Sequence, residues 1–184
     1  MNPVKSGANN IQIHRLKNKI GTWPLPTAEL SLNGAIGYCV GELGQGVRTI
    51  APVLNITRLH SAVNSVSYLA RCLQIAKSYA NVRHITKRNE QGVRTTLLRD
   101  LPLHTHTLAK VSVLYRALMQ MTFGTIALLG RAEYGTATPG ELAMLRVLTP
   151  LVKGYTATYA VDGMEECMVA LGGQGYMEEN GIGR

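Results

Sequence analysis

The residues of this 184-residue chain that could bind a charged ligand are concentrated in its middle third. Residues 44–104 carry nine Lys and Arg against two Asp and Glu, whereas residues 105–184 carry six against seven. Within the basic stretch, Arg58 and Arg83 are candidate ligands for a phosphorylated cofactor, because a guanidinium can bind phosphate through two parallel hydrogen bonds. Each also has a structural interpretation, an ion pair within the fold for Arg58 and a solvated basic loop around Arg83 and Lys87.

A second candidate site is a glycine-rich turn near the end of the chain. The sequence reads Leu-Gly-Gly-Gln-Gly-Tyr over residues 171–176. Because glycine has no side chain, Gly172 and Gly173 would let a ligand lie directly against the backbone. Glycine pairs also end helices, so the same residues are expected in a turn that binds nothing.

The remaining reactive side chains do not form a catalytic or metal-binding pattern. His104 and His106 are two residues apart and cannot share a helix face, so we predict no metal site. Cys39, Cys72 and Cys167 form no CxxC pair, which argues against a structural zinc site or a redox dithiol. An odd number of scattered cysteines is typical of a reducing compartment. We therefore expect an intracellular protein, with no signal that identifies an organelle.

The composition predicts a folded domain that positions these residues. Hydrophobic residues make up 46% of the chain and charged residues 16%, which excludes a disordered protein. No apolar run reaches about 18 residues without a charge, so no membrane insertion is expected. The net charge of +8 is compatible with nucleic acid, but zinc-finger spacing, a heptad zipper and an aromatic-rich platform are all missing from the sequence. Nucleic acid is therefore a disfavoured partner.

The periodicity of apolar residues predicts a mainly α protein with a short β segment followed by three long helices. Apolar and polar residues alternate at Ile11–His14 and at Ala28–Leu32, as in half-buried strands, and Asn33-Gly34 predicts a turn. From Val47 the period becomes about 3.6, and long helices with short connections pack antiparallel as a bundle. Three helices leave one side of a bundle uncovered, unless a fourth helix or a partner chain covers it. The predicted helices span residues 47–82, 97–133 and 139–171, and the predicted polar loop spans residues 83–96.

Several short motifs accompany this order of elements. They are Arg-Leu-Lys-Asn-Lys-Ile-Gly at 15–21, Pro-Thr-Ala-Glu-Leu at 26–30, Gly-Glu-Leu-Gly-Gln-Gly-Val at 41–47, Thr-Arg at 57–58 and Leu-Arg-Asp-Leu-Pro-Leu at 98–103. Together they resemble the acyl-CoA dehydrogenase family, in particular its alkylation-response, AidB-like branch. The resemblance implies that residues 1–43 are a remnant of the family's middle β-domain. Residues 44–184 would then be an incomplete C-terminal helical bundle domain with three antiparallel helices.

The resemblance implies an FAD-dependent oxidoreductase that introduces an α,β double bond into an acyl-CoA thioester. The pathway would be fatty-acid oxidation or the biosynthesis of a fatty-acid-like metabolite. In this chemistry a Glu removes the α-proton, usually from a Tyr/Trp-Glu-Gly motif beyond the Gly-Gly turn, and the chain ends at Arg184 before such a motif. In some members the base lies instead at the position of Thr57, whose hydroxyl is too weak a base. The sequence therefore predicts no catalytic residue in this chain, and its activity stays open.

Two parts of an FAD site can be carried over from the family by position. Arg83 takes the place of the Arg in an Arg-x-Phe-Gly or Arg-x-x-Phe-Gly motif. In the family this Arg contacts the FAD pyrophosphate region of a neighbouring subunit, and here Ile85 and Thr86 replace the usual Phe and Gly. Gly172 and Gly173 match a Gly-Gly-x-Gly-aromatic turn that approaches the adenosine end of the flavin. The predicted cofactor-binding residues are Arg58, Arg83, Gly172 and Gly173.

Two other functions stay open beside the enzyme. An apolar face without a fourth helix would allow a non-catalytic interaction module that pairs with itself or with a full-length relative, since family members are homo-oligomers. The basic charge, together with DNA-associated members of the AidB-like branch, leaves a nucleic-acid-associated protein as a further alternative.

Overall fold

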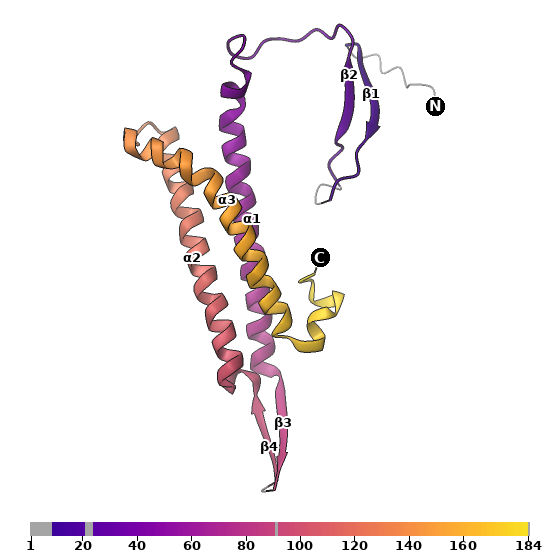
Figure 1. Ribbon diagram of the computed structural model, residues 1–184, viewed down its shortest axis with the longest axis vertical. Coiled ribbons are helices and arrows are strands. Elements are labelled where there is room, and N and C mark those ends of the chain that lie inside the picture. Colours follow the sequence, from indigo (N-terminus) through magenta and orange to yellow (C-terminus); the bar gives the residue numbers. More distant parts are fainter. Residues whose placement is uncertain (1–8, 21–23, 91, 184) are drawn as a thin grey trace. The chain divides into compact units, whose positions relative to one another are not determined.

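The computed structural model describes residues 9–20, 24–90 and 92–183 (Figure 1). The chain divides into two compact units, Met1–Thr49 and Ile50–Arg184, and each is described by itself. The division falls a few residues beyond the boundary expected after residue 43. The origin of the first unit in a middle β-domain stays a prediction.

The first unit contains one antiparallel hairpin. Strand β1 (Ile11–Leu16) pairs with β2 (Ala28–Leu32), so the alternating pattern located both strands. Arg15 donates from Nε and Nη2 to the two carboxylate oxygens of Glu29 across the pair, at 2.8 and 2.9 Å. This bidentate contact lowers the pKa of Glu29 because it stabilises the ionised carboxylate. Gly34, in the predicted turn, adopts a φ of +72°, which glycine tolerates without strain.

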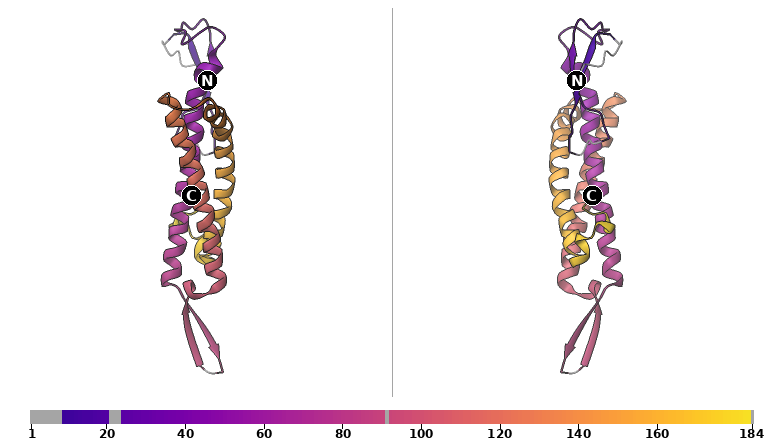
Figure 2. Two further views of the ribbon diagram at one scale, coloured as in Figure 1. Left: turned by 90° about the vertical axis from the view of Figure 1, so that its left-hand side faces the viewer. Right: turned by 90° about the vertical axis from the view of Figure 1, so that its right-hand side faces the viewer.

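Three long helices build the second unit, and only the first turn of the first helix is assigned to the other unit. They are α1 (Gly46–Val82), α2 (Pro102–Glu133) and α3 (Pro139–Val169). The helices lie side by side, and each runs opposite to the one before it (Figures 1 and 2). This arrangement confirms the predicted fold class, three long antiparallel helices preceded by a short β segment.

The predicted polar loop over residues 83–96 is wrong, because this segment forms a second antiparallel hairpin. Strand β3 (His84–Asn89) pairs with β4 (Gly92–Leu97), and the hairpin extends from the end of the bundle where α1 ends and α2 begins (Figure 1). Its Ile, Val and Thr residues favour strands, but the intervening Lys and Arg side chains hide that signal in the sequence. Gly92 opens the returning strand with a φ of +122°.

Two predicted helix ends are also corrected. Helix α2 begins at Pro102 rather than near Leu97, after the short 3₁₀ helix η1 (Leu98–Asp100). Proline is well placed there because the first helical residues need no intrahelical N–H donor. Helix α3 ends at Val169, and the glycine-rich residues follow it as the 3₁₀ helix η2 (Gly172–Tyr176).

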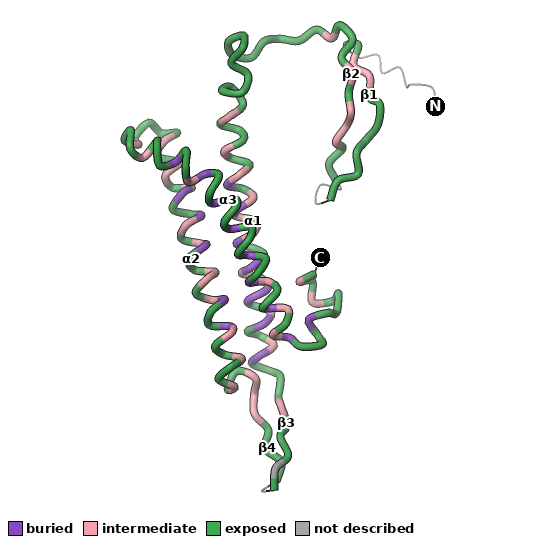
Figure 3. Tube along the Cα trace, in the orientation of Figure 1, coloured by how far each residue is buried: buried purple, intermediate pink, exposed green. Residues whose placement is uncertain are grey.

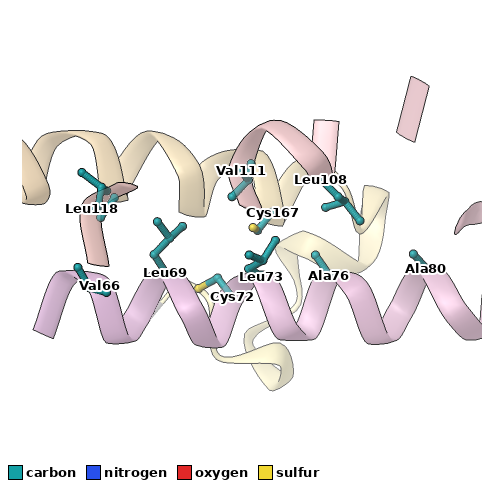
Figure 4. Packing of buried hydrophobic residues seen from close by; sticks show 11 residues of the cluster. Val66, Leu69, Cys72, Leu73, Ala76, Ala80, Leu108, Val111, Leu118 and Cys167 are labelled. Carbon is teal, nitrogen blue, oxygen red and sulfur yellow. The ribbon is translucent and has the colours of Figure 1, made fainter. Parts of the chain in front are cut away.

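The main hydrophobic core lies where the three helices face one another (Figure 4). Its residues recur every three or four positions along α1, which places them on one face of that helix. Two cysteines belong to this core, and burial raises the pKa of Cys167 to about 12, with a smaller contribution from nearby Cys72. The core consists of Val66, Leu69, Cys72, Leu73, Ala76, Ala80, Leu108, Val111, Leu118, Ala160 and Cys167.

Helix α3 also carries apolar side chains that nothing in the described chain covers. Met144, Leu151, Tyr155 and Tyr159 recur at helical spacing and are 40% to 53% exposed. The Tyr155 and Tyr159 rings lie against each other, with centroids 4.3 Å apart. Along the α3 trace in Figure 3, exposed positions in green recur between buried positions in purple. The expectation that three helices leave one side of the bundle uncovered agrees with this surface.

Helix α2 is the one described helix that is long and apolar enough to cross a membrane by length and composition. Its buried residues, including Leu108, Val111 and Leu118, pack in the common core with α1 and α3. The core helix of a bundle meets the same length and composition criteria. The expectation of no membrane insertion stays a prediction.

Candidate cofactor-binding site

The hairpin end of the second unit contains an open pocket of about 930 Å³. Its walls come from the end of α1, from β3, from the beginning of α2 and from the end of α3 with the η2 turn. Arg83, Gly172 and Gly173, three of the four predicted cofactor-binding residues, all line it. The fold thus brings together residues that belong to different ends of the sequence.

The backbone of Arg83 is fixed at the junction between α1 and β3. Its N–H donates to the carbonyl of Tyr79 at 2.9 Å, and its carbonyl accepts from the N–H of Leu98 at 2.9 Å. Within the described part of the chain, neither Arg83 nor Lys87, which also lines the pocket, has a carboxylate partner. Two unpaired cations on one pocket attract an anionic ligand.

The β3 strand determines which of its side chains reach this pocket. Successive strand residues point to opposite faces, so Ile85 and Lys87 share one face and Thr86 points away from it. Ile85 and Lys87 line the pocket accordingly, and Thr86 does not. Of the two residues that replace the family's Phe and Gly, only Ile85 therefore contributes to the pocket wall.

The η2 turn contains three glycines, and a different structural reason applies to glycine at each position. Gly172 has a φ of +60°, which disfavours other residues. Gly175 is buried, and a Cβ there would collide with the carbonyl oxygen of Met168. Gly173 has neither constraint, because its φ is not positive and a Cβ would meet nothing within 4 Å. A ligand lying against the backbone would account for glycine at this position.

Asn180, which no motif in the sequence marks as a site residue, holds the η2 turn in place. Its Nδ2 donates to the carbonyls of Gln174 at 2.8 Å and Gly175 at 3.1 Å, and its Oδ1 accepts from the N–H of Ile182 at 2.7 Å. The dipeptide Asn180-Gly181 is a turn signal, but such a signal does not show which carbonyls the side chain will bind.

Two titratable side chains line the pocket without having been predicted there. His104 lies in the first turn of α2, and its Nε2 is enclosed without a hydrogen-bond partner among the described residues. Glu166 is exposed on the α3 wall of the pocket. In the described ranges, no group of three or more His, Cys, Asp or Glu side chains is arranged to hold a metal ion.

Arg58 lies outside the pocket. It lies on α1, 24 positions before Val82, the last residue of that helix and the neighbour of Arg83, which corresponds to about 36 Å along the helix axis. Its Nη1 donates to Oδ1 of Asn55 at 3.3 Å, an ordinary contact within one helix turn. Its role as a cofactor-binding residue stays a prediction.

Comparison with known proteins identifies the family. The family profile described as acyl-CoA dehydrogenase, C-terminal domain, matches residues 44–184. Acyl-CoA dehydrogenase family member 11 of Caenorhabditis elegans is 43% identical over 174 residues, covering 95% of this chain and 27% of that protein. AidB of Escherichia coli (strain K12) is 28% identical over 176 residues, covering 96% of this chain and 30% of that protein. This chain belongs to the acyl-CoA dehydrogenase family.

Solved structures agree with this assignment. The crystal structure of Caenorhabditis elegans ACDH-11 in complex with C11-CoA matches with a TM-score of 0.77 and 44% identity, covering 95% of this chain and 28% of that one. The structure of the apo-form of Bd2924 matches with a TM-score of 0.78 and 43% identity, covering 96% and 33%. The chain spans between 27% and 31% of the length of the curated relatives it matches. Members of the family are FAD flavoproteins and oxidoreductases.

Proposed function

We propose that this chain is part of an FAD-dependent acyl-CoA dehydrogenase, which introduces an α,β double bond into an acyl-CoA thioester. In this proposal the Arg83 pocket holds the pyrophosphate and adenosine end of FAD. The observation that carries the proposal is the convergence of Arg83 and Gly173, two residues carried over from different family motifs, on one pocket. A relative solved with C11-CoA supports acyl-CoA as the substrate class.

The residues present fit the anionic end of FAD. Arg83 would bind pyrophosphate oxygens through its guanidinium, and Lys87 would add a second positive charge. The open space at Gly173 would allow the ligand to contact the backbone. When bound, the flavin supplies the hydride acceptor of the reaction.

This chain is not proposed to supply the catalytic base. Thr57, at the position where some members carry that base, donates its hydroxyl hydrogen to the carbonyl of Leu54 at 2.9 Å. Whatever its hydrogen bond, a threonine hydroxyl is far too weak a base to remove an α-proton near neutral pH. The contribution of this segment is to bind and orient the cofactor.

Titration of the purified chain with FAD tests the proposal. We expect saturable binding, retention of a flavin absorbance near about 450 nm after gel filtration, and competition by ADP, since the pocket would recognise the diphosphate end. Arg83→Gln should weaken FAD binding by about tenfold, the effect expected for loss of a charge-assisted hydrogen bond. A chain that is helical by circular dichroism but binds neither FAD nor ADP would contradict the proposal.

A second candidate function is pairing with another helical chain through α3, either a second copy or a full-length relative. The observation that favours it is the exposed apolar series of Met144, Leu151, Tyr155 and Tyr159. Light scattering after gel filtration should then give a mass above the 20.0 kDa of one chain. Leu151→Glu should disrupt the pairing and return the mass to that of one chain. A wild-type chain that elutes as a monomer would contradict self-association.

A further inference from the structure

Helices α1 and α2 enclose a second pocket, of about 300 Å³, which we call the Lys77 pocket. Among the described residues, those that line it come from α1, η1 and α2, and none of them lines the Arg83 pocket. Two positions along an α-helix correspond to a rotation of about 200°, so Lys77 and Asn81 lie on the opposite face of α1 from Tyr79, which lines the Arg83 pocket. The Lys77 pocket is therefore a separate site on another side of the bundle.

The Lys77 pocket is rich in hydrogen-bond donors. Lys77 and Asn81 contribute from α1, and Arg99 contributes from η1. Nη1 of Arg99 donates to Oδ1 of Asn81 at 3.3 Å, which orients these two side chains relative to each other. This bond uses the acceptor of the Asn81 amide, so the Nδ2 hydrogens stay available to a ligand. An ammonium, a guanidinium and an amide N–H group together suit the oxygens of an oxyanion.

The cations of this pocket have no carboxylate at hydrogen-bond distance within the described part of the chain. Lys77 forms no ion pair there, and the ion pair of Arg99 with Asp100 is long, at 3.7 Å from Nε to Oδ1. None of the described residues that line the pocket is acidic. The positive charge of Lys77 and Arg99 is thus available to an anion.

Two hydroxyl groups on α2 also line the pocket, and their hydrogens are already used. Oγ1 of Thr105 donates to the carbonyl of Arg99 at 2.7 Å, and Oγ of Ser112 donates to the carbonyl of Leu108 at 2.7 Å. The remaining lone pairs of both oxygens can accept hydrogen bonds from hydroxyl groups of a ligand. A ligand with both an oxyanion and hydroxyl groups therefore matches this pocket better than a bare oxyanion does.

We propose that the Lys77 pocket binds a small phosphate monoester that carries hydroxyl groups. The phosphate contacts Lys77, Arg99 and the Asn81 amide, and the hydroxyl groups donate to Thr105 and Ser112. A terminal phosphate carries a charge of about −1.5 to −2, which two cations balance, whereas a carboxylate carries a single charge. A volume of about 300 Å³ is at the lower end for small-molecule pockets, which fits a ligand of this size. The site uses no residue of the proposed FAD pocket, so it does not depend on the proposed function.

Calorimetric titration of the 184-residue chain in phosphate-free buffer tests this proposal, with glycerol 3-phosphate, inorganic phosphate and acetate as probes. We expect saturable binding of glycerol 3-phosphate and about tenfold weaker binding of inorganic phosphate, which lacks the hydroxyl groups. Acetate should show no saturable binding. A chain that is helical by circular dichroism and binds neither phosphate compound would overturn the proposal.

The double variant Lys77→Gln/Arg99→Gln should weaken glycerol 3-phosphate binding at least about tenfold. Lys110→Gln/Arg116→Gln is the matched control, because it removes the same charge from exposed positions outside the pocket, and it should bind as wild type does. Equal losses in the two double variants would show a non-specific effect of net charge and would overturn the site. FAD affinity should be the same in Lys77→Gln/Arg99→Gln and wild type. A parallel loss of FAD binding would contradict a separate site.

Ser112→Ala tests the hydroxyl contacts. It removes one acceptor and leaves the cations in place, so it should lower the affinity for glycerol 3-phosphate and leave that for inorganic phosphate unchanged. Wild type that binds the two phosphate compounds equally well would overturn the assignment to a hydroxyl-bearing monoester. Equal losses for both compounds in Ser112→Ala would do the same.

Discussion

Arg83 and Gly173 line the same pocket, although one follows the first long helix and the other follows the last. The antiparallel order of the three helices explains why these two residues line one pocket. Because successive helices are antiparallel, α1 and α3 run in the same direction and end at the same end of the unit (Figure 2). The C-terminal end of a helix carries partial negative charge, so a cation such as Arg83, which directly follows α1, is favourably placed there. The β3–β4 hairpin then adds its own side chains to the pocket.

Removal of the Asn180 side chain should loosen the η2 turn and weaken cofactor binding indirectly. Asn180→Ala removes three hydrogen bonds that involve the backbone of the turn and of Ile182. We expect faster amide hydrogen exchange over residues 172–182, lower FAD affinity and little change in global melting. Asn180→Asp keeps the acceptor for Ile182 but loses both donated bonds, so it should give an intermediate effect. Unchanged exchange in Asn180→Ala would contradict this role.

The capping box of α3 should make stability depend on pH in the acid range. The Glu141 carboxylate accepts a hydrogen bond from the Thr138 N–H at 2.8 Å and forms an ion pair with Arg131. These contacts lower the pKa of Glu141 below 4.5, and the hydrogen bond from the Thr138 N–H contributes most. Because the folded pKa is depressed, the stabilisation is present above the unfolded pKa and disappears as the pH falls through the folded value. Glu141→Gln can keep the capping box but cannot ionise.

The expected measurement is a pair of urea unfolding series, wild type against Glu141→Gln. Wild type should be the more stable at pH 7, and the difference should shrink as the pH falls below 4.5. A difference that is constant from pH 7 to pH 3 would argue against an ionised Glu141 as its source.

Two buried threonines of α3 should respond in opposite ways to the same substitution. The hydroxyl of Thr156 is buried without a partner among the described residues, whereas that of Thr149 donates to the carbonyl of Leu145 at 2.7 Å. An unsatisfied buried hydroxyl carries a desolvation penalty, so Thr156→Val should raise the free energy of unfolding by about 1 kcal/mol. Thr149→Val should lower it by about 1 kcal/mol. Equal effects in chemical denaturation would contradict the assignment.

The three cysteines should differ sharply in reactivity. Cys39 is exposed, while Cys72 and Cys167 are buried in the helical core. Burial raises the pKa of both core thiols, to about 12 for Cys167. At pH 8 each of these thiols is therefore ionised in only a small fraction of the protein molecules. We expect iodoacetamide to label one cysteine per native chain and three after denaturation, by mass spectrometry. Rapid native labelling of Cys167 would show that the core opens readily.

Much of the fold could be predicted from the sequence because its helices are long and their apolar positions recur regularly. The sequence Thr138, Pro139 and Glu141 predicts the beginning of α3, since a cap, a proline and an acid are each favoured there, and the structure has all three in these roles. The β3–β4 hairpin was missed because both its faces are largely exposed, so it lacks the apolar alternation that identifies a half-buried strand. The charged residues, together with Asn89 and Gly92, suggested a loop at residues 83–96.

The candidate site was predictable only where a motif marked it. Arg83 and Gly173 were predicted as site residues because they match two family motifs. Neither the basic charge nor the glycine content of the sequence predicts that the two residues line the same pocket. The role of Asn180 depends on side-chain hydrogen bonds, which no local pattern specifies. Arg58 shares its residue type with Arg83, but it lies about 36 Å along α1 from the end of the helix that Arg83 follows.

The most direct test of the cofactor pocket is the FAD affinity of Gly173→Val compared with wild type. Gly154→Val is the matched control, because Gly154 is also a glycine without positive φ or close neighbours, and it lies outside the pocket. We expect Gly173→Val to keep the wild-type melting temperature and to lose at least about tenfold in FAD affinity, while Gly154→Val should bind FAD as wild type does. Wild-type FAD affinity in a folded Gly173→Val chain would contradict it.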